Sequence, residues 1–236
     1  MVRKRGTAAE RVAEVLRRRI TDGDLPPGIQ LSEEKLVARM AVSRNTLREA
    51  FRLLAHDGLL VHRLNRGVFV SEYDKDDVVD LYRLRRIVEC EVVRSLVGLN
   101  AERLAPLRAE VEAADSAAAR DAWDDVGTAN MHFHQRLVGL AGSRRIDDVT
   151  RRLLAELRLI FHVAASPHVL HAPYVDRNRA LLELLTAGDV SGAADELDSY
   201  LHDSEKQLLN AYHRAHDSAR VHDPVSDLRP VEGASR

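Results

Sequence analysis

The chain has 236 residues, of which 45% are hydrophobic, 31% charged and 4% aromatic. This composition is typical of a globular protein of one or two domains, and the scarcity of aromatic residues favours helices over strands. The single cysteine, Cys90, excludes a disulfide framework and a cysteine-based zinc finger. Because no apolar run is long enough for a transmembrane helix and no secretory signal follows the basic start, we expect a cytoplasmic protein without a membrane partner.

The net charge of −2 conceals an uneven distribution along the chain. Residues 1–72 hold 14 Lys or Arg and 9 Asp or Glu, a net charge of +5. Residues 73–236 hold 21 Lys or Arg and 28 Asp or Glu, a net charge of −7. A basic first third joined to an acidic remainder suggests an anion-binding module attached to a separate body.

In the first third of the chain, apolar residues recur three times at helical spacing, and Ser43 has the position of an N-cap before the third run. After Gly58 the pattern changes to two short strands joined by a polar turn. Three helices followed by a hairpin predict a winged helix-turn-helix domain over residues 1–72. The expected elements are helices at 8–21, 32–40 and 43–57 and strands at 59–61 and 68–70.

From residue 75 onward only helical periodicity is found, interrupted by short breaks. Short connections predict that neighbouring helices pack antiparallel as a bundle, which gives a mainly α protein with an all-helical domain over residues 73–216. Residues 217–236 contain prolines and lack periodicity, which is typical of a disordered tail. The expected helices of the bundle are 75–97, 102–118, 121–140, 144–164, 174–187 and 190–215.

The start of the third helix carries side chains suited to reading DNA. It corresponds to the part of a recognition helix that meets base edges in the major groove, and its residues are Ser43, Arg44, Asn45, Thr46 and Arg48. Arg44 and Arg48 share one helix face, and arginine can bond guanine O6 and N7 together. The alternative is an ordinary amphipathic helix with a solvated basic face, which the neighbouring hairpin disfavours.

This segment resembles the N-terminal domain of GntR-family transcriptional regulators over about residues 8–71. The resemblance rests on Gly23-Asp24-Leu25-Pro26-Pro27-Gly28, Val42-Ser43-Arg44, Leu47-Arg48-Glu49-Ala50, Asp57-Gly58-Leu59 and Arg66-Gly67-Val68-Phe69-Val70. It implies that the side chains of the recognition helix reach an operator. It also implies a wing whose tip is Arg66 and Gly67, with Arg63 and Asn65 as weaker contacts.

One position departs from the pattern of that family, which commonly has an arginine after the Ser-Glu pair. This chain has Glu34, whose carboxylate can accept a hydrogen bond from cytosine N4 but cannot pair with guanine. The resemblance therefore leaves the preferred half-site open.

Residues 75–215 resemble the FCD subfamily, the FadR-like branch whose effector domain is all-helical. The matching motifs are Leu84–Glu89, Asn130–His134, Arg179–Glu183 with Gly188-Asp189, and Tyr200-Leu201. Many members of that subfamily bind a divalent metal through one Asp or Asn and three His. The corresponding positions in this sequence are Asn130, His134, Asn178 and Tyr200.

Of these four positions, only His134 keeps the commonest metal ligand. Amides and un-ionised phenols are weak ligands for soft divalent metals, so we expect no metal cofactor. A metal that does bind would use Asn130 and His134, which share a helix face. The alternative for His134 is a core histidine bonded to a neighbour. A solvated loop is favoured over a replacement metal site at a further histidine cluster, His162, His168 and His171.

Arg85 lies within the apolar stripe of the first helix of the bundle, and the resemblance places an effector carboxylate near it. A guanidinium binds a carboxylate bidentately. The alternative is an ion pair with Glu89, four residues further on, and both can hold at once. The expected pocket suits a small organic acid or another anionic metabolite, and its residues are Arg85, Asn130, His134, Asn178 and Tyr200.

No phosphate-binding loop, nucleophile elbow or zinc-protease motif is present, and Cys90 lies between two glutamates that raise its pKa. We therefore expect no enzyme. The interpretation is a homodimeric repressor that binds an inverted-repeat DNA operator and responds to an anionic effector. Two alternatives are a metal-responsive sensor and an architectural DNA-binding protein whose helical body serves only to dimerise.

Overall fold

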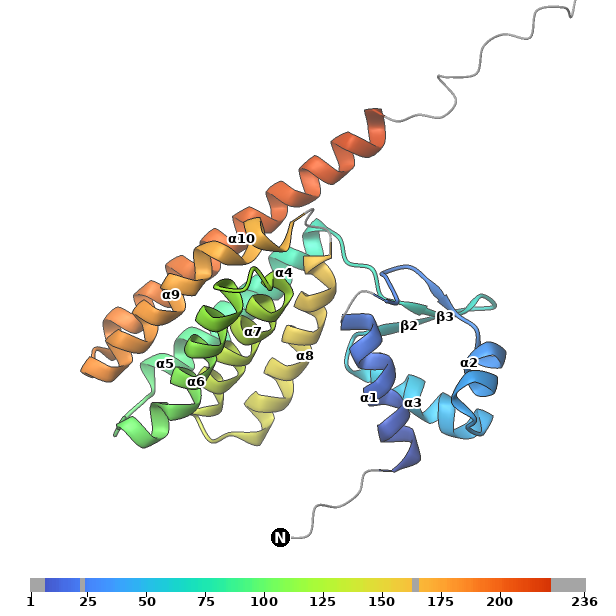
Figure 1. Cartoon of the computed structure of the whole chain (residues 1–236), viewed down its shortest axis with the longest axis horizontal. Coiled ribbons are helices and arrows are strands. Elements are labelled where there is room, and N and C mark those ends of the chain that lie inside the picture. The colour runs from blue at the N-terminus through green and yellow to red at the C-terminus, as the bar shows by residue number, and fades with distance from the viewer. Residues whose placement is uncertain (1–6, 22–23, 163–165, 222–236) are drawn as a thin grey trace, which may run out of the picture.

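The structure is a computed structural model that describes residues 7–21, 24–162 and 166–221, with side chains up to Arg214. It consists of a small N-terminal head beside a helical bundle (Figure 1). This arrangement confirms the mainly α fold class and the order of the two parts. The elements of the head are α1 (Ala8–Thr21), β1 (Gln30–Leu31), α2 (Glu33–Met40), α3 (Arg44–His56), β2 (Leu60–Arg63) and β3 (Gly67–Val70).

Serine caps begin the second and third helices of the head. The Ser43 hydroxyl accepts a hydrogen bond from the Thr46 backbone N–H at 3.0 Å, and Ser32 caps α2 in the same way. These bonds satisfy amide groups that have no partner inside the helix. The inner face of α3 is fully buried, and it carries Leu47, Phe51 and Leu54. The head is therefore held by a compact apolar core with α3 at its centre.

A three-stranded antiparallel sheet, in the order β1-β3-β2, forms the wing. In its register Leu60 pairs with Val70 and Arg63 with Gly67, while Gln30 pairs with Phe69. The sequence analysis did not predict β1. A strand of two residues is too short to show an alternating hydrophobic pattern. This one forms because it pairs with the free edge of β3.

The bundle begins with a continuous helical rod in three parts, α4 (Lys75–Arg85), the π-helical turn η1 (Arg86–Cys90) and α5 (Glu91–Arg94). The wider π turn was not predicted, and such turns occur frequently at functional sites. The other helices are α6 (Ala101–Ala118), α7 (Trp123–Gly139), α8 (Arg144–Phe161), α9 (Pro167–Ala187) and α10 (Val190–Val221).

Helix α9 starts at Pro167, seven residues before the predicted start at 174. Pro173 lies inside it and has no N–H to donate to the carbonyl of Val169, but the Gln207 side chain donates to that carbonyl instead, at 2.7 Å. The loop interpretation of His168 and His171 was therefore wrong, since both belong to α9. A proline at position 173 indicated a break in the sequence, but the side chain of Gln207 replaces the missing hydrogen bond and the helix continues through it.

The end of α10 also differs from the expectation. The helix continues to Val221, so the predicted tail does not begin at residue 217. Residues 222–236, the rest of that predicted tail, lie outside the described residues.

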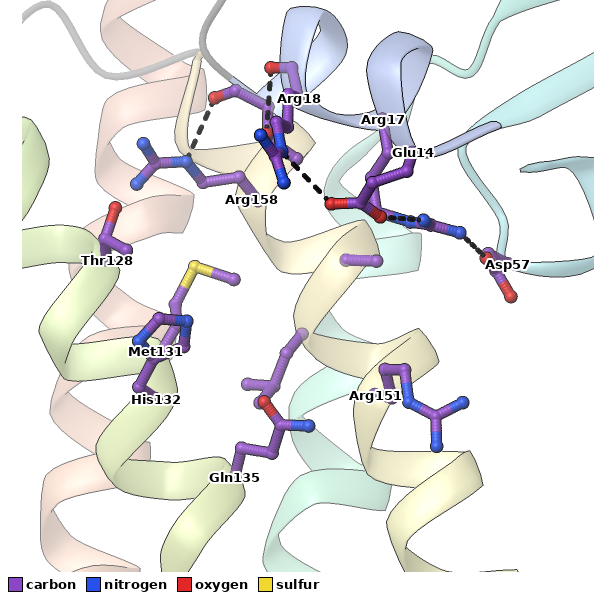
Figure 2. Close-up of a pocket in the computed structure, with 13 residues that line it drawn as sticks. Glu14, Arg17, Arg18, Asp57, Thr128, Met131, His132, Gln135, Arg151 and Arg158 are labelled. Carbon is purple, nitrogen blue, oxygen red and sulfur yellow. Dashed lines mark hydrogen bonds and ion pairs between the residues drawn. The ribbon is translucent and has the colours of Figure 1, made fainter. Parts of the chain in front are cut away.

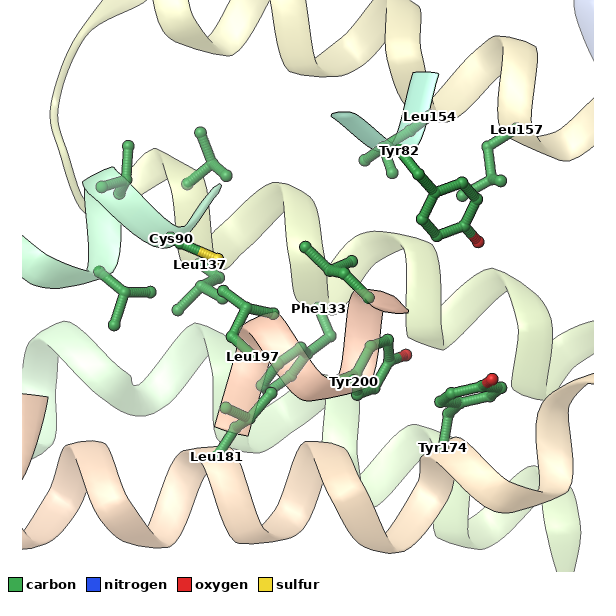
Figure 3. Close-up of a cluster of buried hydrophobic side chains, with 14 of the residues drawn as sticks. Tyr82, Cys90, Phe133, Leu137, Leu154, Leu157, Tyr174, Leu181, Leu197 and Tyr200 are labelled. Atoms are coloured by element: carbon green, nitrogen blue, oxygen red, sulfur yellow. The ribbon is translucent and has the colours of Figure 1, made fainter. Parts of the chain in front are cut away.

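Helix α8 contributes to both apolar cores. Leu154 and Leu157 pack in the core of the bundle, part of which is seen in Figure 3, whereas Leu159 is buried in the core of the head. On the same helix, Arg158 Nε donates to the backbone carbonyl of Thr21, at the end of α1, at 3.1 Å. The head and the bundle are thus joined by packing as well as by the chain. None of the described helices combines the length and the apolar character needed to cross a membrane.

Candidate nucleic-acid interface and buried polar site

The predicted recognition residues lie at the solvent-exposed start of α3. Arg44 and Asn45 have no side-chain hydrogen bond or ion pair to any described residue, so both side chains are available to a ligand. The hydroxyls of Ser43 and Thr46 lie 2.8 Å apart and help to cap the helix. A capped helix N-terminus directs backbone N–H groups outward, which favours a phosphate there.

Arg48 is exposed and forms an ion pair with Glu33, the first residue of α2, at 3.1 Å. Arg48 therefore has an internal partner that DNA would have to displace or share. Glu34, the residue that departs from the family pattern, is also exposed beside this pair. The sequence analysis did not predict the bond to Glu33, because the two residues belong to different helices.

The wing turn presents Asn65, Arg66 and Gly67 to solvent, as predicted. Gly67 has φ +97°, a conformation that favours glycine, and the Gln30 side chain donates to the carbonyl of Arg66 at 2.6 Å. Arg63 is less accessible, because its guanidinium pairs with Glu72 at 2.7 Å and lies over the ring of Phe69. Leu64 was not predicted as a contact, yet it is 90% exposed in the same turn.

The five predicted effector-site residues converge inside the bundle from four helices, and each is at most 8% exposed. Asn130 joins three of these helices: its side-chain oxygen accepts hydrogen bonds from Asn178 at 2.7 Å and from the Tyr200 hydroxyl at 2.8 Å. His134 lies one turn further along α7, with its ring centroid 5.0 Å from that of Tyr200. The sequence analysis therefore identified residues that do lie together.

Glu89, on the π turn, completes this cluster with a carboxylate. One oxygen accepts from Arg85 Nε at 2.6 Å, and the other lies 2.7 Å from Nδ1 of His134. The ion pair offered as the alternative for Arg85 is thus present. Because Glu89 neutralises Arg85, this buried polar site carries no excess of positive charge.

The protonation states of the three groups follow from burial and mutual charge. Burial opposes the charge on Glu89, but Arg85 and His134 outweigh it and lower the pKa of Glu89 to about 2. Burial lowers the pKa of His134, and Glu89 only partly opposes that shift. A carboxylate can only accept, so the neutral His134 ring carries its proton on Nδ1 and has a lone pair on Nε2.

Three polar atoms of the cluster are buried without a hydrogen-bond partner among the described residues: Arg85 Nη2, His134 Nε2 and Asn178 Oδ1. The first is a charged donor and the other two are acceptors. A buried polar atom without a partner costs about 1–3 kcal/mol, so native proteins rarely keep several together. A ligand with one anionic group and two donor hydrogens would satisfy all three atoms.

The donor set fits a divalent metal poorly. The side-chain oxygen of Asn130 already accepts two hydrogen bonds, and burial raises the pKa of Tyr200 well above its ordinary value, so its phenol stays protonated. Among the described residues, no three His, Cys, Asp or Glu side chains are grouped so as to hold a metal ion. Both oxygens of Glu89 are bonded to Arg85 and His134. His134 Nε2 is therefore the one strong metal ligand that remains in this cluster of described residues.

Comparison with known proteins assigns both parts of the chain. The gntR family of bacterial regulatory proteins matches residues 8–70, and the FCD domain matches residues 80–203. A solved transcriptional regulator GntR from Rhodococcus sp. RHA1 has a TM-score of 0.80 and 42% identity, covering 86% of this chain and 98% of that chain.

Two curated relatives agree with that assignment. An HTH-type transcriptional regulator of Streptomyces ambofaciens is 30% identical over 79% of this chain and 78% of its own length. The HTH-type transcriptional repressor RspR of Escherichia coli K12 is 29% identical over 73% of this chain and 78% of its own length.

Proposed function

Because the chain belongs to the GntR family of bacterial regulatory proteins and carries an FCD domain, we propose that it is a metabolite-controlled repressor. Its head binds an operator in double-stranded DNA, and its bundle binds a small organic anion that changes operator affinity. The chain acts as a homodimer, so two heads read an inverted repeat, since a two-fold symmetric protein matches a palindromic site.

The operator is read by α3 in the major groove. Arg44 and Asn45 are exposed and unpaired among the described residues, which supports direct contacts to base edges. Ser43 and Thr46 hold the phosphate backbone at the helix start, while Arg66 and Gly67 contact DNA beside the major-groove site.

The observation that carries the effector proposal is the unpartnered Nη2 of Arg85, buried beside two unpartnered acceptors. A carboxylate on the ligand bonds Arg85 Nη2, and an ammonium group or two hydroxyl groups on the ligand donate to His134 Nε2 and Asn178 Oδ1. Glu89 stays bonded to Arg85 Nε and keeps the guanidinium in place. The ligand binds these side chains directly, without a metal ion.

Effector binding reaches the head through α7 and α8. Asn130 and His134 are on α7, which packs against α8, and α8 is anchored in the head by Leu159. A ligand that shifts α7 therefore changes the placement of α8 and of the two heads. Operator affinity changes because one head spacing fits the inverted repeat better than the other.

Two experiments test this function. Selection from a random-sequence duplex library with the full chain is expected to yield an inverted repeat. A thermal-shift screen of small carboxylic acids is expected to find a hydroxy or amino acid that raises the melting temperature, while its methyl ester does not. Failure to select any sequence would contradict the operator proposal. A screen in which acids and their esters behave alike would contradict the role of Arg85.

A further inference from the structure

A cavity of about 750 Å³ lies between the head and the bundle and shares no lining residue with the buried polar site. Figure 2 shows that its walls come from α1 on one side and from α7 and α8 on the other. Its residues on α7 are Thr128, Met131, His132 and Gln135, on a different face from Asn130 and His134. Its volume is in the range of small-molecule sites, which is about 300–1,000 Å³.

The lining of this interdomain cavity combines apolar side chains with several arginines. Met131, Leu154 and Ala155 supply apolar surface, and among the described residues the lining also holds four arginines and two carboxylates, Glu14 and Asp57. Those two carboxylates already have partners: Arg17 bonds both, at 2.7 Å to Glu14 and 2.5 Å to Asp57, and Arg18 also pairs with Glu14 at 3.2 Å. Four guanidinium groups against two carboxylates give the described lining a formal excess of positive charge.

From this chemistry we propose that the interdomain cavity is a second ligand site, which takes a small organic anion with a flat apolar body. The apolar part lies on Met131, Leu154 and Ala155, and the anionic group lies near Arg151 and Arg18. Arg151 is 58% exposed, and its one partner among the described residues is Asp148, one turn earlier on the same helix, so it can turn toward a ligand.

Such a ligand would control the arrangement of the two parts of the chain. Because α1 belongs to the head while α7 and α8 belong to the bundle, a bound ligand contacts both the head and the bundle. It therefore favours the arrangement in which the two lie as they do here. The existing contacts across this boundary include the packing of Leu159 in the core of the head, the hydrogen bond from Arg158 to the Thr21 carbonyl and an Arg152–His56 contact. A ligand in the cavity would therefore stabilise the head against the bundle independently of the buried polar site.

The test uses naphthalenesulfonate as the anionic probe and naphthol as a neutral molecule of similar shape, titrated calorimetrically into the full chain. We expect saturable binding of the sulfonate at one site per chain and weaker binding of naphthol. Gln135→Trp fills one end of the cavity and should abolish binding, and the Gln135 side chain forms no hydrogen bond or ion pair with a described residue. Arg151→Glu should weaken sulfonate binding about tenfold or more. Arg145→Glu, the same charge change at an exposed position of α8 outside the cavity, should leave binding unchanged.

Hydrogen exchange locates the probe. Protection is expected in peptides covering residues 14–21, 128–135 and 151–158 together, and Arg85→Lys should not alter it. Protection confined to peptides containing residues 85–89 and 178 would mean that the sulfonate occupies the buried polar site, and would overturn the proposal. Binding that survives Gln135→Trp, or that Arg145→Glu weakens as much as Arg151→Glu, would overturn it as well.

Discussion

Arg85 and Glu89 form an ion pair at 2.6 Å inside the helical bundle, and both side chains are only 2% exposed. Removing one partner of such a pair leaves an uncompensated buried charge, which costs about 3–5 kcal/mol. Arg85→Met should therefore lower the free energy of unfolding by that amount in urea denaturation at pH 7. The double variant Arg85→Met/Glu89→Gln should recover part of the loss, because it removes both charges. A single variant as stable as the wild type would show that the pair is not buried as described.

The same cluster explains why an alanine at position 85 is a poor probe of effector binding. Arg85→Ala would destabilise the bundle and confuse loss of fold with loss of ligand. Arg85→Lys keeps a positive charge beside Glu89 but has no planar fork to hold Glu89 and a carboxylate together. It is the better variant for separating the two effects.

Buried His171 makes stability depend on pH. Burial, with a smaller contribution from Arg158, lowers the pKa of His171 to about 4. The unfolded chain takes up this proton near pH 6.5 and the folded chain does not, so stability is full above pH 6.5 and falls as the pH drops toward 4. His171 alone should cost about 2 kcal/mol of unfolding free energy between pH 7.5 and 5.

Urea denaturation at these two pH values measures this contribution. His171→Gln should reduce the difference in unfolding free energy between pH 7.5 and 5 by about that amount. His202→Gln, at an exposed position, is the matched control and should leave the difference as it is in the wild type. An equal pH dependence in the wild type and His171→Gln would mean that His171 titrates normally.

The recognition helix should tolerate little change at its exposed start. Arg44→Ala and Arg48→Ala should each weaken specific operator binding by about 1–3 kcal/mol in fluorescence anisotropy. Arg83→Ala removes an equally exposed arginine from the bundle and serves as the control for net charge. If Arg83→Ala lowers operator affinity as much as Arg44→Ala does, the loss would come from net charge alone, and the assignment of Arg44 to direct operator contacts would be contradicted.

Local pattern predicted most of the fold, and distant contacts account for the rest. The first helix, over residues 8–21, was predicted at its observed bounds, because its apolar face and the break after it lie in adjacent sequence. The strand at Gln30–Leu31 and the start of α9 were missed, because β3 and Gln207 complete them from far along the chain. The π turn gave no signal in the spacing of apolar residues.

The candidate sites followed the same rule. Residues matched through motifs, such as Asn130 and Tyr200, proved to be in contact. The second bond of Glu89, to His134, joins residues that are 45 positions apart in the sequence and could not be predicted from one sequence. That bond fixes the tautomer of His134, so the chemistry of the site emerged only with the structure.

Restoring two histidines should turn the buried polar site into a metal site. The FCD resemblance places three histidines where this chain has His134, Asn178 and Tyr200. The wild type should contain essentially no zinc or nickel by elemental analysis, whereas Asn178→His/Tyr200→His should bind about one metal per chain. The single variant Tyr200→His is the control and should bind less. One metal per wild-type chain would contradict the metal-free site.

The most direct test of the account is a titration of operator affinity with the acid found in the thermal-shift screen. In the wild type, the acid should change the dissociation constant for the selected operator by about 5–150-fold. In Arg85→Lys, operator affinity without the acid should match the wild type, and the acid should have no effect. An equal response in both proteins would contradict the claim that Arg85 anchors an anionic effector that controls DNA binding.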